Sequence, residues 1–132
     1  MKILVDTSVW SLALRRQGGT LDAKVTQLHD LIAGGQTIYL LGVILQEILQ
    51  GIGNREQFHK LRQYLEPFPM IELLRNDYVF AAQLGSDCRH KGIQASTVDY
   101  LIAAAAIQHD CYLLTADKDF IFVASVSALK LL

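Results

Sequence analysis

Short apolar runs recur along the chain and predict the strands of a sheet. The first of them is apolar at every position, as in a strand that is covered on both faces of a parallel sheet. The others are rich in residues that favour strands. The expected strands are Ile3–Val5, Thr37–Leu41, Met70–Leu74 and Tyr112–Thr115, with a possible fifth at Ala128–Leu132.

The longer stretches between these runs carry apolar residues at helical spacing, and glycine or proline ends most of them. The expected helices are Ser8–Arg15, Leu21–Ala33, Val43–Gln50, Arg55–Leu65, Asp77–Lys91, Ser96–Ile107 and a short turn at Lys118–Val123. Thr20 is the expected N-cap of the second helix, after a break at 17–19. Because strands and helices alternate, we expect a three-layer α/β fold whose central, mostly parallel sheet has about four to five strands flanked by helices.

Length and composition indicate one domain over residues 1–132. Hydrophobic residues make up 52% of the chain and charged residues 19%, which suits a globular protein with a substantial core. No apolar run approaches the roughly 18 residues that span a bilayer, and no signal-peptide pattern follows Met1, so we expect a cytoplasmic protein without membrane contact. Cys88 and Cys111 are too few for a thiolate metal cage or a disulfide framework.

The formal net charge of −1 excludes binding of nucleic acid through a global basic excess. Such binding would need a local basic patch, a metal ion that neutralises the protein's own carboxylates, or a basic partner. The candidate patch residues, for which a solvated helix face is the default, are Arg15, Arg16, Arg55, Lys60 and Arg62.

The first strand stops abruptly at Asp6, which is followed by two hydroxyl residues, Thr7 and Ser8. Ligands of open α/β sheets bind at the carboxyl ends of the strands, so Asp6 is a candidate site residue. From this stretch alone, an N-cap of the next helix is an equally good interpretation. A later strand ends in the same way, at 115–119, where Asp117 and Asp119 also fit an aspartate-rich turn.

Two further acids stand alone among apolar neighbours in predicted helices. Asp99 is the only ionisable carboxylate in 98–107, and its burial would be costly without a partner. The alternative is a capping box, because Asp99 lies three residues after Ser96. Glu47 is similarly isolated in 43–49, although a solvent-facing glutamate is the commoner outcome for such a helix.

These positions are predicted to converge. Asp6 and Asp117 follow strand ends, whereas Glu47 and Asp99 lie in the first turns of helices entered from the same side of the sheet. Carboxylates crowded into one crevice repel one another unless a cation neutralises them, and oxygen ligands favour Mg²⁺ or Mn²⁺. The sequence therefore predicts a metal site at this edge of the sheet.

The ordered set of motifs resembles the PIN domain family and, within it, the VapC-like toxins of bacterial and archaeal toxin–antitoxin pairs. The matching stretches span nearly the whole chain and are 5–10, Glu47 with Gly51, 99–104 and 114–120. The resemblance implies a PIN-like fold, an acidic quartet of Asp6, Glu47, Asp99 and Asp117, and Asp119 as an accessory acid. The resemblance also implies that the hydroxyl group of Thr7, Ser8 or Thr115 interacts with the metal ligands. Gly42 departs from the family pattern, since many relatives carry a hydroxyl residue there that caps the Glu47 helix.

The function implied by this resemblance is that of a Mg²⁺- or Mn²⁺-dependent endoribonuclease. It would be a toxin that cuts cellular RNA and is inhibited by a cognate antitoxin protein. Asp6, Asp99 and Asp117 would hold the metal directly, with Asp119 beside them, while Glu47 and Asp119 would act through water or assist its deprotonation. Relatives commonly pair as homodimers, and we expect the same here.

Two other classes are alternatives. A non-catalytic PIN-like scaffold would bind RNA or protein without cutting, and it would usually lack one of the acids, all of which are present here. Phosphoryl-transfer folds of the haloacid dehalogenase and receiver types need a second aspartate two residues after the first, or an adjacent aspartate pair. Ser8 and Thr7 occupy those two positions in this chain.

Overall fold

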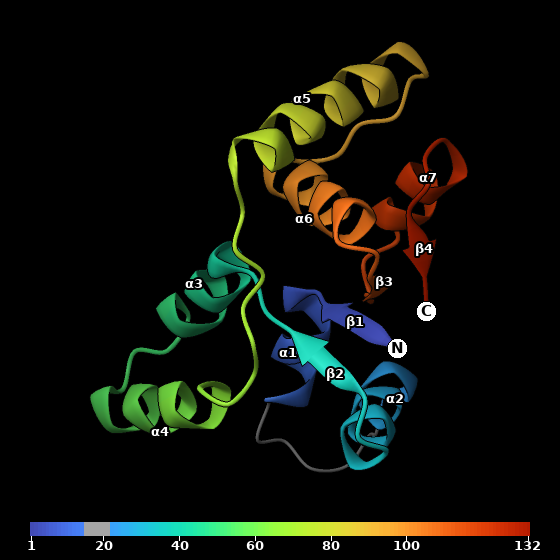
Figure 1. The fold of residues 1–132 in the computed structure, drawn as a ribbon. Helices are drawn as coiled ribbons and strands as arrows, with labels where there is room; N and C mark the ends of the chain where they lie inside the picture. Colours follow the sequence, from blue (N-terminus) through green and yellow to red (C-terminus); the bar gives the residue numbers. More distant parts are fainter. Residues whose placement is uncertain (15–21) are drawn as a thin grey trace.

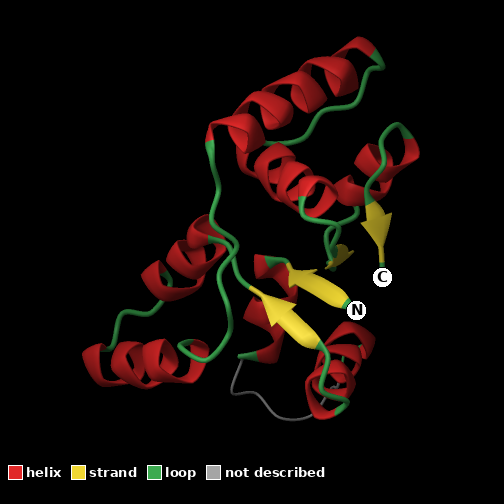
Figure 2. Cartoon of the chain, viewed as in Figure 1, coloured by secondary structure: helices red, strands yellow, loops and turns green. Residues whose placement is uncertain are grey.

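One parallel sheet organises the chain, and the computed structural model describes residues 1–14 and 22–132 of it (Figure 1). The strands are β1 (Lys2–Val5), β2 (Thr37–Tyr39), β3 (Tyr112–Leu114) and β4 (Lys130–Leu131), in the spatial order β2-β1-β3-β4. Each neighbouring pair is parallel, with Leu4 opposite Tyr39 on one side and Leu113 on the other. Figure 2 shows these strands in the middle of the molecule with helices around them, which confirms the predicted α/β fold.

The described residues form seven helices. They are α1 (Thr7–Ala13), α2 (Ala23–Ala33), α3 (Gly42–Gln50), α4 (Arg55–Leu65), α5 (Arg75–His90), α6 (Thr97–Gln108) and α7 (Asp119–Ser125). In Figure 1, α1 and α2 lie on one side of the sheet, and α5, α6 and α7 lie on the other. None of these helices is long and apolar enough to cross a membrane.

Predicted and observed helix bounds agree within about two residues wherever both are described. The helix α2 begins at Ala23, and its N-cap is Asp22, whose side chain accepts a hydrogen bond from the backbone N of Lys24 at 2.8 Å. Thr20, the expected cap, lies outside the described residues, as do the predicted break at 17–19, Leu21, Arg15 and Arg16.

The predicted strand at Met70–Leu74 was wrong. Leu40 donates its backbone N–H to Pro69 and accepts from Ile71, at 2.9 and 2.8 Å, which makes a single parallel bridge between Leu40 and Met70. Beyond that bridge the backbone N of Leu74 donates to the carboxylate of Asp77 at 2.8 Å, and α5 begins at Arg75. The start of a capped helix therefore removes this segment from the sheet edge despite its strand-favouring residues.

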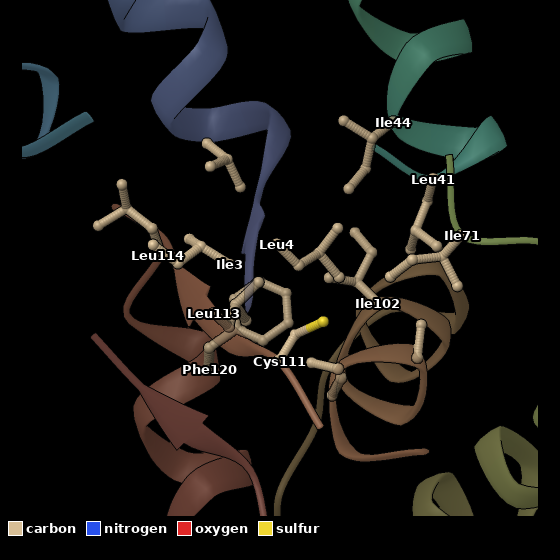
Figure 3. Close-up of a cluster of buried hydrophobic side chains, with 14 of the residues drawn as sticks. Ile3, Leu4, Leu41, Ile44, Ile71, Ile102, Cys111, Leu113, Leu114 and Phe120 are labelled. Carbon is tan, nitrogen blue, oxygen red and sulfur yellow. The ribbon is translucent and has the colours of Figure 1, made fainter. Parts of the chain in front are cut away.

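The core lies around β1 and the helix that crosses it. Ile3, Leu4 and Val5 are fully buried, and so is the run from Ala103 to Ala106 in α6. Figure 3 shows Ile102 of α6 and Phe120 of α7 pointing toward Leu4 and Ile3 of the central strand. Small residues let α6 lie close to the sheet, which fixes the position of its N-terminus at the carboxyl ends of the strands.

The helices α5 and α6 pack antiparallel. Asp77 near the start of α5 contacts His109 just after α6, with 3.0 Å between Oδ1 and Nε2. Gly85 lies against the ring of Tyr100, where an added Cβ would approach Cδ2 to 3.0 Å. A β-carbon at this position would be crowded by the ring, so Gly85 lets α5 and α6 approach closely at this point.

Candidate metal centre

The four predicted acids come together at the carboxyl edge of the sheet. Asp6 follows β1, Glu47 lies in α3, Asp99 lies in the first turn of α6, and Asp117 lies in the loop between β3 and α7. All four line one pocket of about 160 Å³. The other lining residues are Thr7, Ser8, Ser96, Val98 and Ile102. The convergence expected from parallel topology is therefore present.

Asp6 is the most buried of these acids, at 5% exposure. Two hydroxyl groups donate to its Oδ2, from Ser8 at 2.7 Å and from Thr115 at 3.0 Å. Among the described residues no donor reaches Oδ1 of Asp6. The hydroxyls thus hold the carboxylate in one orientation and leave an oxygen for a ligand.

The same two hydroxyls also position the loop that carries Asp117. Ser8 Oγ accepts a hydrogen bond from the backbone N of Ala116, and Thr115 Oγ1 accepts one from the backbone N of Asp117, both at 3.0 Å. Because each hydroxyl donates to Asp6 and accepts from the loop, two strand ends that are distant in sequence are fixed relative to each other.

Glu47 is positioned from a different element than the family pattern implies. The helix α3 begins at Gly42, and no side chain caps its first turn. Thr7 at the start of α1 instead donates to Glu47 Oε1 at 2.9 Å. A hydroxyl from the motif after β1 therefore fixes the carboxylate of Glu47 in this chain.

Asp99 forms the predicted capping box and also faces other acids. Its Oδ2 accepts from the backbone N of Ser96 at 3.2 Å, and its own backbone N donates to Ser96 Oγ at 3.1 Å. Burial raises the pKa of Asp99, and the charges of Asp117 and Asp6 raise it further, against the lowering effect of the Ser96 hydrogen bonds. Capping therefore explains the position of Asp99, but no cation among the described residues compensates its charge.

Asp117 and Asp119 complete the cluster. One carboxylate oxygen of each of Asp99, Asp117 and Asp119 lies within 4.8 Å of the others. Asp117 Oδ1 also accepts from the backbone N of Asp119 at 2.9 Å, which closes a tight turn before α7. Asp6 lines the same pocket, although it lies outside this trio.

The donors fit a hard divalent cation. Every ionisable side chain that lines the pocket is a carboxylate, and no lysine, arginine or histidine among residues 1–14 and 22–132 lines it. Several carboxylate oxygens and hydroxyls in one small pocket match the ligand preference of Mg²⁺ and Mn²⁺. Of the candidate basic residues that the structure describes, Arg55, Lys60 and Arg62 do not line this pocket, and Arg62 lines a separate one with Leu65 and Phe68.

Two features of the site were not predicted from the sequence: Ser96 lines the pocket, and Thr7 donates a hydrogen bond to Glu47. Ser96 was expected only as a cap, yet it lines the pocket. The partners Thr7 and Glu47 are 40 residues apart, and no local pattern links them.

Comparison with known proteins places this arrangement in a family. The PIN domain model matches residues 3–125. Over 130 residues the chain is 28% identical to ribonuclease VapC11 of Mycobacterium tuberculosis, with 97% of this chain and 96% of the relative covered.

Solved structures agree with this match. VapBC2 from Rickettsia felis bound to a promoter DNA fragment has a TM-score of 0.80 at 22% identity, and covers 100% of this chain and 98% of the other. FitAcB from Neisseria gonorrhoeae has a TM-score of 0.71 at 27% identity, over 95% and 94% of the two chains. The family model matches residues 3–125 of the 132 in this chain, and the fold is shared with these structures. This chain therefore belongs to the PIN domain family.

Proposed function

We propose that this protein is the ribonuclease toxin of a toxin–antitoxin pair and that residues 1–132 act as a single PIN-like domain. It would hydrolyse RNA phosphodiester bonds with the help of Mg²⁺ or Mn²⁺. The observation that carries the proposal is the convergence of Asp6, Glu47, Asp99 and Asp117 on one pocket that no cationic side chain of the described residues lines. The similarity to VapC11, which is a ribonuclease, supports the same conclusion.

The side chains divide into metal ligands and residues that orient them. Asp6, Asp99 and Asp117 would hold the ion, with Asp119 as an accessory ligand, because their oxygens face the pocket or lie close to one another. A bound divalent cation supplies an acidified water molecule and neutralises charge at the scissile phosphate. Ser8 and Thr115 keep Asp6 oriented through their hydrogen bonds to its Oδ2.

Glu47 is the best candidate for a general base. Its Oε1 accepts from Thr7, which leaves the other carboxylate oxygen to accept a proton from the attacking water. Among the described residues, no histidine, cysteine or lysine lines the pocket, and the hydroxyls of Thr7 and Ser8 already donate to the carboxylates of Glu47 and Asp6. Direct attack by water therefore fits the described residues better than a covalent intermediate does.

A cleavage assay tests this function. Purified protein incubated with mixed single-stranded RNA should cut it in the presence of Mg²⁺ or Mn²⁺ and leave it intact in EDTA. Asp6→Asn and Asp117→Asn should abolish cutting. Binding of RNA without any cutting, by a folded protein with metal present, would favour the scaffold alternative.

The proposed partner is an antitoxin that masks the carboxylates. One similar solved structure is a toxin–antitoxin complex from Klebsiella pneumoniae, with a TM-score of 0.67 at 21% identity, and we infer a comparable partner here. An antitoxin segment should place a basic side chain against Asp6, Asp99 and Asp117. Arginine suits this role because its planar fork pairs with carboxylates and stays charged when desolvated. A complex that kept full activity and metal occupancy would contradict this mechanism.

Homodimer formation is the second proposed association. The start of α5 exposes large apolar side chains, with Leu74 at 64%, Tyr78 at 54% and Val79 at 61% exposure. Exposed apolar groups that gather on one element often mark an interface. Sedimentation of the protein alone at micromolar concentration should show a dimer, and a monomer at that concentration would contradict this proposal.

A further inference from the structure

A second and larger pocket adjoins the metal centre. It has a volume of about 430 Å³, and Thr115, Ala116 and Asp117 form part of its wall. Asp117 therefore lies between the two pockets, because it lines both. A chain-like substrate whose phosphate reaches the carboxylates would place its neighbouring unit in this second space.

The second pocket, which we call the lysine pocket, has the charges that the metal centre lacks. Lys24 of α2 and Lys118, the residue before α7, line it together with the apolar side chains of Ile121, Leu131 and Leu132. The carboxylates of Asp22, the N-cap of α2, and of Asp117, on the side of the metal centre, also line it. Among the described residues, the ionisable groups that line the metal centre are all carboxylates. RNA needs cations for its phosphates and apolar surface for its bases, and the lysine pocket supplies both.

Both lysines can bind a phosphate. Lys24 Nζ donates one hydrogen bond to the backbone O of Leu132 at 3.2 Å, and its two other N–H donors have no partner among the described residues. Lys118 is exposed, and it forms no ion pair with the residues that the structure describes. The nearby carboxylate of Asp22 accepts from the backbone of Lys24 as the cap of α2.

The apolar wall is suited to a base. Ile121 is 57% exposed although α7 buries Phe120 and Val123 in the core. An exposed apolar side chain next to two lysines and a catalytic cluster can pack on the face of an unpaired base. The pocket volume of about 430 Å³ also leaves room for a nucleoside.

We propose that the lysine pocket binds the nucleotide of single-stranded RNA that adjoins the scissile bond. Lys24 and Lys118 contact its phosphate, and Ile121 with Leu131 and Leu132 contacts its base. This inference rests on the proposed ribonuclease function, and it assigns substrate positioning to residues that lie outside the acidic cluster.

The test compares lysine and apolar variants with matched controls. In steady-state cleavage of a short single-stranded RNA, Lys24→Ala and Lys118→Ala should each raise KM about three- to tenfold and leave kcat nearly unchanged. Each should also reduce the slope of log affinity against log salt by about 0.7. Lys91→Ala, an exposed lysine just after α5, serves as the control and should change neither quantity.

Ile121→Ser should raise KM and alter the nucleotide preference beside the cut while the salt slope stays the same. Phe122→Ser, one residue further along α7 and 56% exposed, is its control, because Phe122 does not line the pocket. This contrast separates contact with a base from contact with a phosphate.

Failure of this inference can be told from failure of the proposed function. If the parent protein cuts RNA but the lysine and Ile121 variants match their controls, the nucleotide pocket is wrong and the function stands. If these variants weaken only inhibition by the antitoxin, the pocket belongs to that partner and the inference is overturned. Equilibrium binding of the same RNA by the slow-cutting Asp99→Asn variant, with and without the lysine substitutions, gives a readout that does not depend on cleavage.

Discussion

The helices α5 and α6 begin with the same device and use it for different ends. In each, an aspartate occupies the third helical position and accepts a hydrogen bond from the backbone N of the N-cap residue. Asp77 accepts from Leu74 at 2.8 Å, and Asp99 accepts from Ser96 at 3.2 Å. Such an acid stabilises a helix because it accepts a hydrogen bond from a free backbone N–H at the N-terminus and because its negative charge interacts favourably with the helix dipole.

The difference lies in the second carboxylate oxygen. Asp77 Oδ1 lies 3.0 Å from Nε2 of His109, so both oxygens of this buried side chain have partners. Asp99 has no such partner among the described residues, and the charges that face it are those of Asp117 and Asp6. A capping acid with both oxygens paired is structural, whereas one that faces like charges is available for a cation.

The sharpest way to test this contrast is Asp99→Asn. The substitution keeps a cap acceptor but removes a charge from the acidic cluster, so it should lower RNA cleavage about a hundredfold or more. In EDTA the variant should melt at the same or a higher temperature than the parent, because repulsion with Asp117 and Asp6 is relieved. Added Mg²⁺ or Mn²⁺ should raise its melting temperature less. Measurement needs only a cleavage assay and thermal melts.

Retained cleavage at the parent's metal concentration, together with a lower melting temperature, would show that Asp99 acts only as a cap. Ser96→Ala is the control for the cap itself. It removes the hydroxyl that accepts from Asp99 N and should cost about 1 kcal/mol of stability without removing any carboxylate.

An aspartate-to-asparagine change at the start of α5 should have the opposite outcome, with stability lowered and cleavage retained. Asp77→Asn removes a charged partner of His109 in a buried position, and should lower the free energy of unfolding by about 1–3 kcal/mol. Cleavage per folded molecule should stay at the parent's level, because Asp77 does not line the metal centre. Urea unfolding, and RNA cleavage rates divided by the folded fraction from circular dichroism, would measure the two quantities separately.

A double-mutant cycle with His109→Ala isolates this pair. If the contact accounts for the loss, His109→Ala should cost clearly less in the Asp77→Asn background than in the parent protein. Additive losses would mean that the two side chains act independently.

Sequence patterns were enough to predict which acids converge, because parallel strands bring their carboxyl ends to one edge whatever their exact register. That is why Asp6, Glu47, Asp99 and Asp117 could be grouped before any coordinates. The pairing of Asp77 with His109 could not be predicted in this way, since the two residues are 32 apart and depend on how α5 packs on α6.

The strand propensity of individual residues also led to a wrong prediction of where the sheet ends. The residues at 70–74 favour a strand, but the backbone N–H of Leu74 donates to the carboxylate of Asp77 as part of the start of α5 and is therefore not available to a sheet. The lysine pocket was hidden for a related reason. Lys24 and Lys118 are 94 residues apart in the sequence, and they line the same pocket only because the segments around β4 pack together.

A smaller effect is expected from Thr7→Val, which tests whether the position of Glu47 matters. The change removes the hydroxyl that donates to Glu47 Oε1 and keeps the side-chain shape. It should lower kcat about three- to tenfold, with less than about 1 kcal/mol lost in stability. Thr97→Val, at the matching first position of α6, is the control, because its hydroxyl forms no hydrogen bond to the described side chains. Equal activity of both variants would mean that Thr7 does not position the base.

The smallest effect concerns Asp110, an acid with a cation beside it, which is the reverse of Asp99. Its Oδ1 accepts from Lys130 Nζ at 2.7 Å on the protein surface, and that hydrogen bond and charge lower the pKa of Asp110 from its ordinary value of 3.8. A lowered pKa in the folded state gives stability that is present above pH 3.8 and is lost as the pH falls through the folded value. Asp110→Asn, which tolerates the positive φ of 54° at this position, should therefore melt slightly below the parent at pH 7 in low salt. The gap should close below pH 3.8 and also in high salt, because exposed ion pairs are screened. A gap that persisted under acid conditions would mean that Asp110 contributes through its backbone turn rather than through its charge.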